Sequence, residues 1–309
     1  MTTKNFADFG KYDFMKIAPI MGAISAVTFI VAVIMISTKG FHYGIDFEGG
    51  TELQVQFATI PDVAKVRTIL DEIGAEGSTV QTFGTGNEIL IRMGQAKGAT
   101  FQETNKLNQA RIDKLTTALK TQMNLPENGI MRVDSVGPQV GSELKKQALL
   151  SVLYSLLVIL LYIGLRFDFR YSPGAVICLF HDTIVLLGIF SILGREVNIQ
   201  VLAGVLTLIG YSLNDTIVVY DSIRENEPTY KDKGFSFVIN RSLNEMLVRT
   251  LLTGTTTLLS AFSLFWFGSG VIQDIAFTLL IGVVLGTFSS IYVAAPLIPI
   301  TDKLFKKFA

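Results

Sequence analysis

Cysteine is almost absent from this sequence of 309 residues, which contains only Cys178. A single cysteine excludes an intrachain disulfide framework and a zinc site built from cysteine clusters. Histidine is nearly as scarce, and we find no His/Cys group with metal-ligand spacing. Cys178 lies in an apolar run, where it is best interpreted as a small buried residue. The sequence therefore predicts neither a metal site nor a cofactor.

Charged residues make up only 17% of the chain and balance to a net charge of zero, so total charge does not indicate a nucleic-acid partner. The mean hydropathy of +0.47 is higher than a soluble domain with a charged surface reaches. The apolar residues form six runs, each near the roughly 20 residues that a helix needs to cross a lipid bilayer. The six predicted membrane spans are Ile17–Ser37, Gln147–Leu165, Pro173–Leu193, Val201–Asp221, Leu247–Phe267 and Ile275–Ile300.

The first apolar run has an alternative interpretation as a secretory signal peptide. It is longer than the roughly 7–15 apolar residues of a signal core, and no small-x-small cleavage site precedes His42. The run is therefore interpreted as a membrane span.

Basic residues are distributed unequally between the two sides of the predicted membrane bundle. If the N-terminus is cytoplasmic, the short cytoplasmic segments are rich in lysine and arginine, whereas the two short loops on the other side hold only Arg195. This asymmetry follows the positive-inside rule and predicts that both termini are cytoplasmic. The long segment 39–146 then lies outside.

The segment between the first two spans has the pattern of a folded domain. Alternating residues predict strands and spaced apolar residues predict helices, in the order β-α-β-β-α-β that is typical of ferredoxin-like domains. The predicted strands are Thr51–Ala58, Ser78–Phe83, Glu88–Met93 and Ile130–Val136, the helices are Val63–Ile73 and Thr100–Met123, and Gly84–Asn87 forms a hairpin turn. The fold class is thus an all-α six-helix membrane bundle with one inserted α+β, ferredoxin-like domain facing the periplasm.

This interpretation divides the chain into three parts. Residues 1–38 form the cytoplasmic N-terminus and first span, residues 39–146 form the outer domain, and residues 147–309 form the remaining five spans. Within the last part, residues 222–246 are expected to be a long cytoplasmic loop. Phe235, Phe237, Val238 and Leu243 would give this loop an amphipathic helix lying on the membrane surface or against a partner.

A glycine-rich motif, Phe41–Gly50 (FHYGIDFEGG), precedes the first predicted strand. Gly44, Gly49 and Gly50 permit a tight backbone path. Asp46 and Glu48 are possible ligands, although a polar loop just outside the membrane is the simpler interpretation. The motif is not a phosphate-binding loop, because the Lys-Ser/Thr pair that completes such a loop is missing.

Ionisable residues occur inside two predicted spans, as His181-Asp182 and as Asn214-Asp215. A charge at the membrane centre costs at least about 2.5–3.5 kcal/mol, so such residues face the protein interior and are candidates for function. From the helical rise, Asp182 and Asp215 lie at similar depths in the cytoplasmic half of the membrane. Arg249, near the start of the fifth span, either reaches this layer or extends to the lipid headgroups. Two roles remain open for the carboxylates: a proton or ion relay, or a hydrogen-bond clamp between helices.

Three stretches together resemble one family: FHYGIDFEGG at 41–50, VDSVGPQVG at 133–141 and GYSLNDTIVVYDSIREN at 210–226. The pattern is similar to the SecD/SecF family of bacterial protein export, which belongs to the resistance–nodulation–division superfamily. The resemblance implies a multi-pass protein of the bacterial cytoplasmic (inner) membrane that uses the proton gradient to assist preprotein translocation. It implies SecD, the SecYEG channel, YajC and the preprotein in transit as partners. It also matches Asp215 to the family's proton-pathway carboxylate and Arg249 to its basic partner.

Three hypotheses follow. The first is a transport subunit in which Asp215, Arg249, Asp182 and Asn214 form a proton pathway coupled to the outer domain. The second is half of a proton-driven small-molecule efflux transporter, which the small outer domain disfavours. The third is a structural scaffold of the translocase, in which the buried charges only fix helix packing. An enzyme is not expected, because the sequence has no nucleophile–base pair or nucleotide-binding loop.

Overall fold

The computed structural model describes residues 10–83, 86–96, 101–167, 171–268 and 270–308. It contains six helical segments long and apolar enough to cross a membrane, as the sequence predicts. They are α1 (Phe14–Lys39), α5 (Pro138–Arg166), α6 (Ser172–Leu193), α7 (Ile199–Thr229), α8 (Phe235–Phe267) and a sixth segment that joins α9 (Val271–Ser289), a π-helical turn (Ser290–Ala294) and α10 (Ala295–Phe308).

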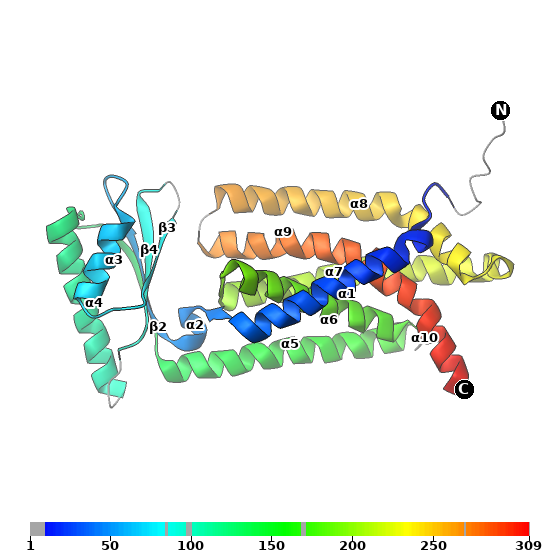
Figure 1. Cartoon of the computed structure of the whole chain (residues 1–309), viewed down its shortest axis with the longest axis horizontal. Coiled ribbons are helices and arrows are strands. Elements are labelled where there is room, and N and C mark those ends of the chain that lie inside the picture. The colour runs from blue at the N-terminus through cyan, green and yellow to red at the C-terminus, as the bar shows by residue number, and fades with distance from the viewer. Residues whose placement is uncertain (1–9, 84–85, 97–100, 168–170, 269, 309) are drawn as a thin grey trace.

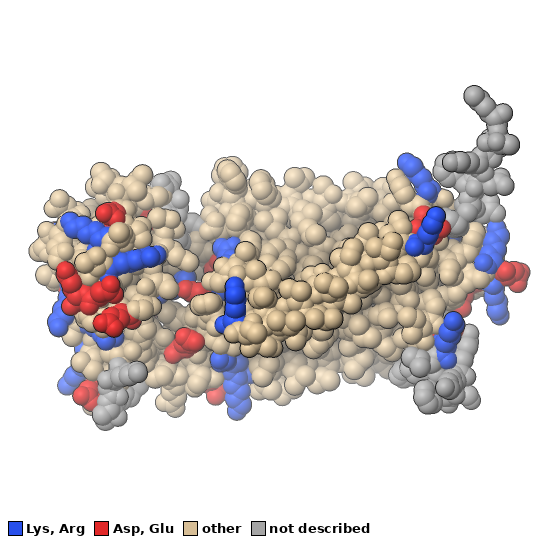
Figure 2. Space-filling view, viewed as in Figure 1, with Lys and Arg blue, Asp and Glu red and all other residues tan. Residues whose placement is uncertain are grey.

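The molecule is elongated, with the helical bundle at one end and a small sheet domain at the other (Figure 1). Helix α1 begins, and α10 ends, at the end of the bundle that lies opposite to the sheet domain. Charged side chains gather on the sheet domain and at the far end of the bundle, while the bundle surface between them is almost free of charge on the face drawn in Figure 2. This uncharged band is what a bilayer core requires of the helices that cross it.

The sheet domain has the element order predicted from the sequence. Four antiparallel strands pair in the order β3-β4-β2-β5, and β2 carries an irregularity between Gln54 and Val55. The two helices pack over the core, which is formed by buried residues such as Leu53, Ile69, Ile91 and Leu115. The elements are β2 (Gly50–Gln56), α3 (Val63–Glu72), β3 (Thr79–Phe83), β4 (Glu88–Met93), α4 (Phe101–Met123) and β5 (Ile130–Val136). Part of the predicted hairpin turn, residues 84–85, lies outside the described residues.

The motif at 41–50 forms more structure than the expected polar loop. It contains a short strand, β1 (His42–Tyr43), and one helical turn, α2 (Ile45–Glu48). Gly49 and Gly50 have φ values of 78° and 146°, and a Cβ atom on Gly50 would lie 2.6 Å from the carbonyl oxygen of Met93. Glycine is required here because only glycine adopts this backbone at such close approach.

A second pairing joins the sheet domain to the bundle. Strand β1 pairs in parallel with β6 (Glu196–Val197), which lies in the short connection between α6 and α7. Helix α5 makes another connection, because it begins at Pro138, directly after β5, and continues without a break through the second predicted span. The two parts are therefore connected by continuous secondary structure.

The prediction of a long loop at 222–246, with an amphipathic helix on the membrane surface or against a partner, is wrong. Helix α7 continues to Thr229 and α8 begins at Phe235, so both spans extend beyond the apolar runs. Val238 and Leu243 are buried in the core of the bundle, against residues of α6, α7 and α10. The apolar face that the sequence indicates thus packs on the protein itself.

Close contact between α7 and α9 depends on glycine. Cβ atoms on Gly282 and Gly286 would lie 2.8 Å from Cδ1 of Leu208 and 3.0 Å from Cβ of Ser212. Small residues allow membrane helices to approach closely and to bond across their interface. This packing brings serine residues of α7 and α9 next to α6.

Candidate functional site

Asp182 of α6 lies in the middle of the bundle, only 1% exposed. Its Oδ2 atom accepts hydrogen bonds from Ser212 of α7 at 2.7 Å and from Ser289 of α9 at 2.6 Å. Its Oδ1 atom lies 3.0 Å from Nδ1 of His181. The carboxylate therefore holds three helices together and has a partner for each oxygen, which is the geometry of an interhelical clamp.

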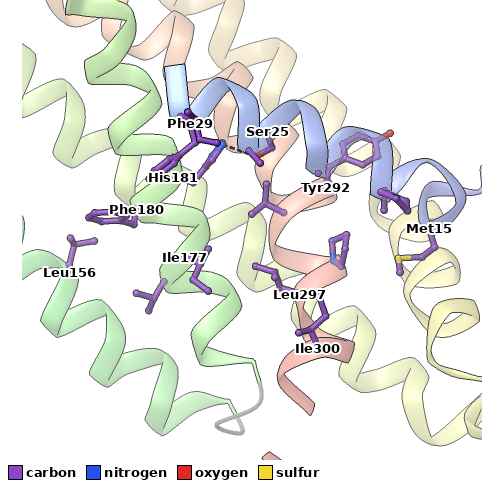
Figure 3. A pocket seen from close by; sticks show the side chains of 18 residues that line it. Met15, Ser25, Phe29, Leu156, Ile177, Phe180, His181, Tyr292, Leu297 and Ile300 are labelled. Carbon is purple, nitrogen blue, oxygen red and sulfur yellow. Dashed lines mark hydrogen bonds between the residues drawn. The ribbon is translucent and has the colours of Figure 1, made fainter. Parts of the chain in front are cut away.

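His181 extends this cluster to the first helix. Its Nε2 atom lies 2.7 Å from the hydroxyl of Ser25 on α1, and the ring of Phe29 stacks on it. Figure 3 shows this pair on the wall of an apolar groove with a volume of about 870 Å³ between α1, α6 and the sixth segment. His181 and Asp182 together thus connect α1 to α6, α7 and α9.

Asp215 differs from Asp182 in its bonding. It is 3% exposed and lies three residues beyond Ser212 on α7, but its Oδ2 atom has no hydrogen-bond partner among the described residues. A buried carboxylate oxygen without a hydrogen-bond partner costs folding free energy. Unpartnered polar atoms of this kind are found at catalytic and other functional sites more often than elsewhere. Of the two carboxylates inside the bundle, only Asp215 has a buried oxygen without a hydrogen-bond partner among the described residues.

Two hydroxyl groups beside Asp215 share this property. The hydroxyls of Tyr211 on α7 and Thr287 on α9 also lack hydrogen-bond partners in the described part of the chain. Both interact with Asp215, and both converge on Gly254 of α8, where a Cβ atom would lie 3.4 Å from Thr287 Oγ1 and 3.8 Å from Tyr211 Oη. Gly254 therefore lies where α8 faces the two hydroxyl groups that interact with Asp215.

Arg249 lies on α8 within electrostatic reach of Asp215. Its side chain is exposed on the surface of the bundle, and no ion pair joins it to Asp215 in the described structure. Asn214 is likewise exposed, so it is not part of the buried cluster. The structure therefore places Arg249 near Asp215 and leaves Asn214 outside the buried cluster.

A helical irregularity lies next to this layer. The hydroxyl of Thr216, adjacent to Asp215, lies 2.9 Å from the hydroxyl of Ser290, the first residue of the π-helical turn. One turn further along α7, Tyr220 donates a hydrogen bond to the carbonyl oxygen of Ala294 at the end of that turn. Single π-helical turns are frequent at functional sites, because the wider turn changes the helix path.

Sequence reasoning did not find Tyr211, Thr287 or Gly254. Tyr211 precedes Asp215 by one helical turn, so its position was a usable signal. Thr287 and Gly254 lie on α9 and α8, and only the tertiary packing brings them to α7. Among the described residues, no group of three or more His, Cys, Asp or Glu side chains could hold a metal ion.

The motif residue Asp46 lies at the N-terminal end of α7. Its Oδ2 atom accepts a hydrogen bond of 3.1 Å from the backbone N–H of Ile199, the first residue of α7. Asn198 is the N-cap and accepts a hydrogen bond from Val201. Acceptors at a helix N-terminus satisfy unpaired N–H groups and interact favourably with the helix dipole. Asp46 therefore connects the glycine-rich motif to the helix that carries Asp215.

Two family models match the chain. The model of the SecD/SecF protein export membrane protein, C-terminal part, covers residues 115–303, and the model of the SecD/SecF GG motif covers residues 34–59. The first alone spans more than half of the sequence. The chain belongs to the SecD/SecF family of protein-export membrane proteins. The resemblance seen in the sequence is thereby confirmed.

Curated members of the SecD/SecF family are similar over nearly their whole length. The protein translocase subunit SecF of Desulfurispirillum indicum is 41% identical over 288 residues, which cover 92% of this chain and 90% of that protein. The protein translocase subunit SecF of Magnetococcus marinus is 44% identical over 284 residues, which cover 91% of this chain and 89% of that protein.

Solved structures of the family show the same fold. The crystal structure of SecDF, a translocon-associated membrane protein from Thermus thermophilus, matches with a TM-score of 0.81 and 31% identity. A structure of SecDF in a super-membrane-facing form matches with a TM-score of 0.70 and 31% identity. This chain spans 40% and 39% of those two chains, so it corresponds to only part of each SecDF protein.

Proposed function

We propose that this chain is a subunit of the bacterial preprotein translocase that, with SecD, uses the proton gradient to assist export across the cytoplasmic membrane. Asp215 binds and releases the proton in this account. Arg249 modulates its charge from the bundle surface, while Tyr211 and Thr287 provide hydroxyl groups through which a proton reaches it. Asp182 takes the structural role of a clamp instead.

The observation that carries the proposal is the contrast between the two buried carboxylates. Asp182 has hydrogen-bond partners on both oxygens, whereas Oδ2 of Asp215 is buried without one, next to two unpartnered hydroxyls. Hydrogen bonds to both oxygens stabilise a carboxylate in its charged form, whereas a buried oxygen without a donor lacks that stabilisation and can accept a proton with little rearrangement.

In this proposal the sheet domain is a ferredoxin-like domain on the periplasmic side, and both termini are cytoplasmic. Two features support this orientation. The helix ends farthest from the sheet domain carry the basic residues that the positive-inside rule assigns to the cytoplasm, such as Lys11, Lys16 and Arg224. The short connection between α6 and α7, on the sheet-domain side, carries a single basic residue, Arg195. Its charge is balanced by Asp274, which lies 3.7 Å away.

The partners follow from the family. The similar SecDF chains are more than twice as long as this chain, which supports a separate SecD subunit as the source of the remaining spans. The exposed positions of Arg249 and Asn214 on the bundle surface fit such a subunit better than they fit lipid, because polar groups are costly in hydrocarbon. SecYEG, YajC and the preprotein complete the proposed assembly, and the role is non-catalytic.

The scaffold hypothesis remains the main alternative, and the clamp around Asp182 is the observation in its favour. Preprotein translocation into inverted membrane vesicles separates the two. The Asp215→Asn variant should lose gradient-dependent translocation and keep co-purification with SecD. The matched variant Asn214→Asp places a carboxylate at the exposed neighbouring position and should not restore activity to Asp215→Asn. Full gradient-dependent activity of Asp215→Asn would contradict the proposal.

A further inference from the structure

The connection between the sheet domain and the bundle contains an ion pair that the motifs of the sequence do not indicate. Nη1 of Arg92 on β4 lies 2.5 Å from Oε2 of Glu196 on β6, and Nε of Arg92 pairs with Glu52 on β2. The side chains of Arg92 and Glu196 are each only 15% exposed. Arg92 thus has one carboxylate partner within its own domain and one on the membrane bundle.

Glu196 lies at the start of the helix that carries the candidate proton site. It is three residues before α7, and Val197 accepts a hydrogen bond of 2.9 Å from the backbone N–H of Gly44. Asp46 bonds to the first residue of the same helix. Contacts from β1, α2 and β4 therefore converge on the N-terminal end of α7. Asp215 follows 16 residues into this helix, or about 24 Å along its axis.

The surroundings of the ion pair allow it to separate. A polar cavity of about 500 Å³ lies between the sheet domain and the ends of α7 and α9, and both Arg92 and Glu196 line it. Separating two buried charges costs free energy unless water or other charged groups solvate them. Other charged side chains, such as Arg132 and Asp134, line this cavity. Arg92 also keeps Glu52 as a partner when it leaves Glu196. The pairing strand β1 has only two residues, so few backbone bonds oppose the separation.

We infer that Arg92 and Glu196 form a releasable latch that couples the orientation of the sheet domain to the position of helix α7. When the latch is closed, a shift of α7 is transmitted to β4. When it opens, β4 is released from α7, and the sheet domain is held to the bundle only by the β1–β6 pairing, the bond of Asp46 and helix α5. The purpose of the latch depends on the proposed function, in which α7 carries the proton site. Its existence as a charge-dependent contact does not depend on that function.

A distance measurement by electron paramagnetic resonance tests the latch in the full chain assembled with SecD. Spin labels are placed at Gln81 on the edge strand β3 and at Leu193 at the end of α6, both of which are exposed, and the buried Cys178 is replaced by Ala. Arg92→Gln leaves Glu196 buried without its counter-charge. The ratio of the open to the closed population in the distance distribution should then rise about tenfold, which corresponds to about 1.4 kcal/mol.

A double variant and a control make the result specific. Adding Glu196→Gln to Arg92→Gln removes the unpaired charge and should restore the closed distance, which a packing role of Arg92 would not produce. Arg132→Gln breaks an ion pair with Asp134 that lines the same cavity but lies within β5, and it should leave the distances unchanged. An unchanged distance in Arg92→Gln, or no restoration by Glu196→Gln, would overturn the latch. Either result can be obtained whether or not Asp215 proves to carry protons.

Discussion

Ser212 of α7 donates a hydrogen bond of 2.7 Å to Oδ2 of Asp182 on α6, and it does so only three residues before Asp215. The same helix thus supplies a donor to one buried carboxylate and carries the other. Asp182 is satisfied by this bond and by Ser289, whereas Oδ2 of Asp215 has no partner within the described structure. The layer of polar residues in the bundle is therefore divided into a structural part around Asp182 and, in the proposed function, a functional part around Asp215.

The structural part should be sensitive to loss of a donor. Ser289→Ala removes a hydrogen bond of 2.6 Å to a carboxylate that is 1% exposed, and it should reduce the stability of the bundle by about 1–3 kcal/mol. Thermal unfolding in detergent measures this change. Ser260→Ala is the matched control, because Ser260 is exposed and bonds only within α8, and its effect should stay within about 0.5 kcal/mol. Equal effects of the two variants would contradict the clamp.

Substitutions around Asp215 should lower activity and leave stability unchanged, in contrast to the substitution at Ser289. Tyr211→Phe and Thr287→Val remove hydroxyl groups that make no hydrogen bond in the described chain, so the thermal stability should not decrease. Gradient-dependent translocation should fall, because the route of the proton to Asp215 is interrupted. Tyr220→Phe is the comparison variant: its hydroxyl bonds to Ala294, so this change should lower stability instead. A loss of stability without loss of activity in Tyr211→Phe would exclude its proposed role.

The latch should depend on pH in a defined direction. Burial raises the pKa of Glu196 above its ordinary value, and this effect exceeds the opposing effect of Arg92; Glu52 and Asp274 add to the increase. The paired strand β1 also brings His42 opposite Glu196. Glu196 therefore binds a proton more tightly in the closed latch than it does when the latch is open and the carboxylate is solvated. Proton binding to Glu196 consequently stabilises the closed latch. This stabilisation is fully present below the ordinary pKa of glutamate and is lost as the pH rises through the raised pKa.

Acidification over that window should therefore increase the closed population in the spin-label experiment. The Glu196→Gln variant removes the titrating group, so the change of the closed population with pH should largely disappear. A pH dependence that is the same in Glu196→Gln would assign it to another group, of which His42 is the nearest on the paired strand.

The glycine-rich motif should tolerate no side chain at its end. Gly50→Ala places a Cβ atom 2.6 Å from a backbone oxygen at a φ of 146°, and it should destabilise the sheet domain by about 1–3 kcal/mol. Gly94→Ala is the control, since nothing lies within 4 Å of its added Cβ atom. Chemical denaturation of the two variants, followed by circular dichroism, compares them. A stability of Gly50→Ala equal to that of Gly94→Ala would show that the motif has another role.

The sequence was sufficient for the features that depend on local pattern. Runs of about 20 apolar residues indicate spans directly, and alternating residues such as those around Leu53 indicate strands, so six spans and the β-α-β-β-α-β order were predictable. The extension of α7 and α8 beyond their apolar runs was not predictable in this way. The pattern of Val238 and Leu243 predicts an apolar helix face, which could lie on the membrane surface or pack in the core of the bundle. Only the tertiary structure distinguishes the two, and it places both residues in the core.

The candidate site shows the same limit. Asp182 and Asp215 are equally unusual inside apolar runs, and the helical rise predicts similar depths for them without separating their roles. The distinction depends on Ser289 and Thr287, which are 72 or more residues away along the chain from either carboxylate and carry no signal of their own. The Arg92–Glu196 pair is equally non-local, because it joins a strand of the sheet domain to the connection between two spans.

Proton flux tests the central claim most directly. The chain and SecD are reconstituted in liposomes with an imposed pH gradient, and a pH-sensitive dye inside the liposomes measures proton movement. The account predicts that the wild-type protein increases the rate of proton movement and that Asp215→Asn abolishes this increase, while Ser260→Ala leaves it unchanged. Proton movement through Asp215→Asn at the wild-type rate would contradict the account.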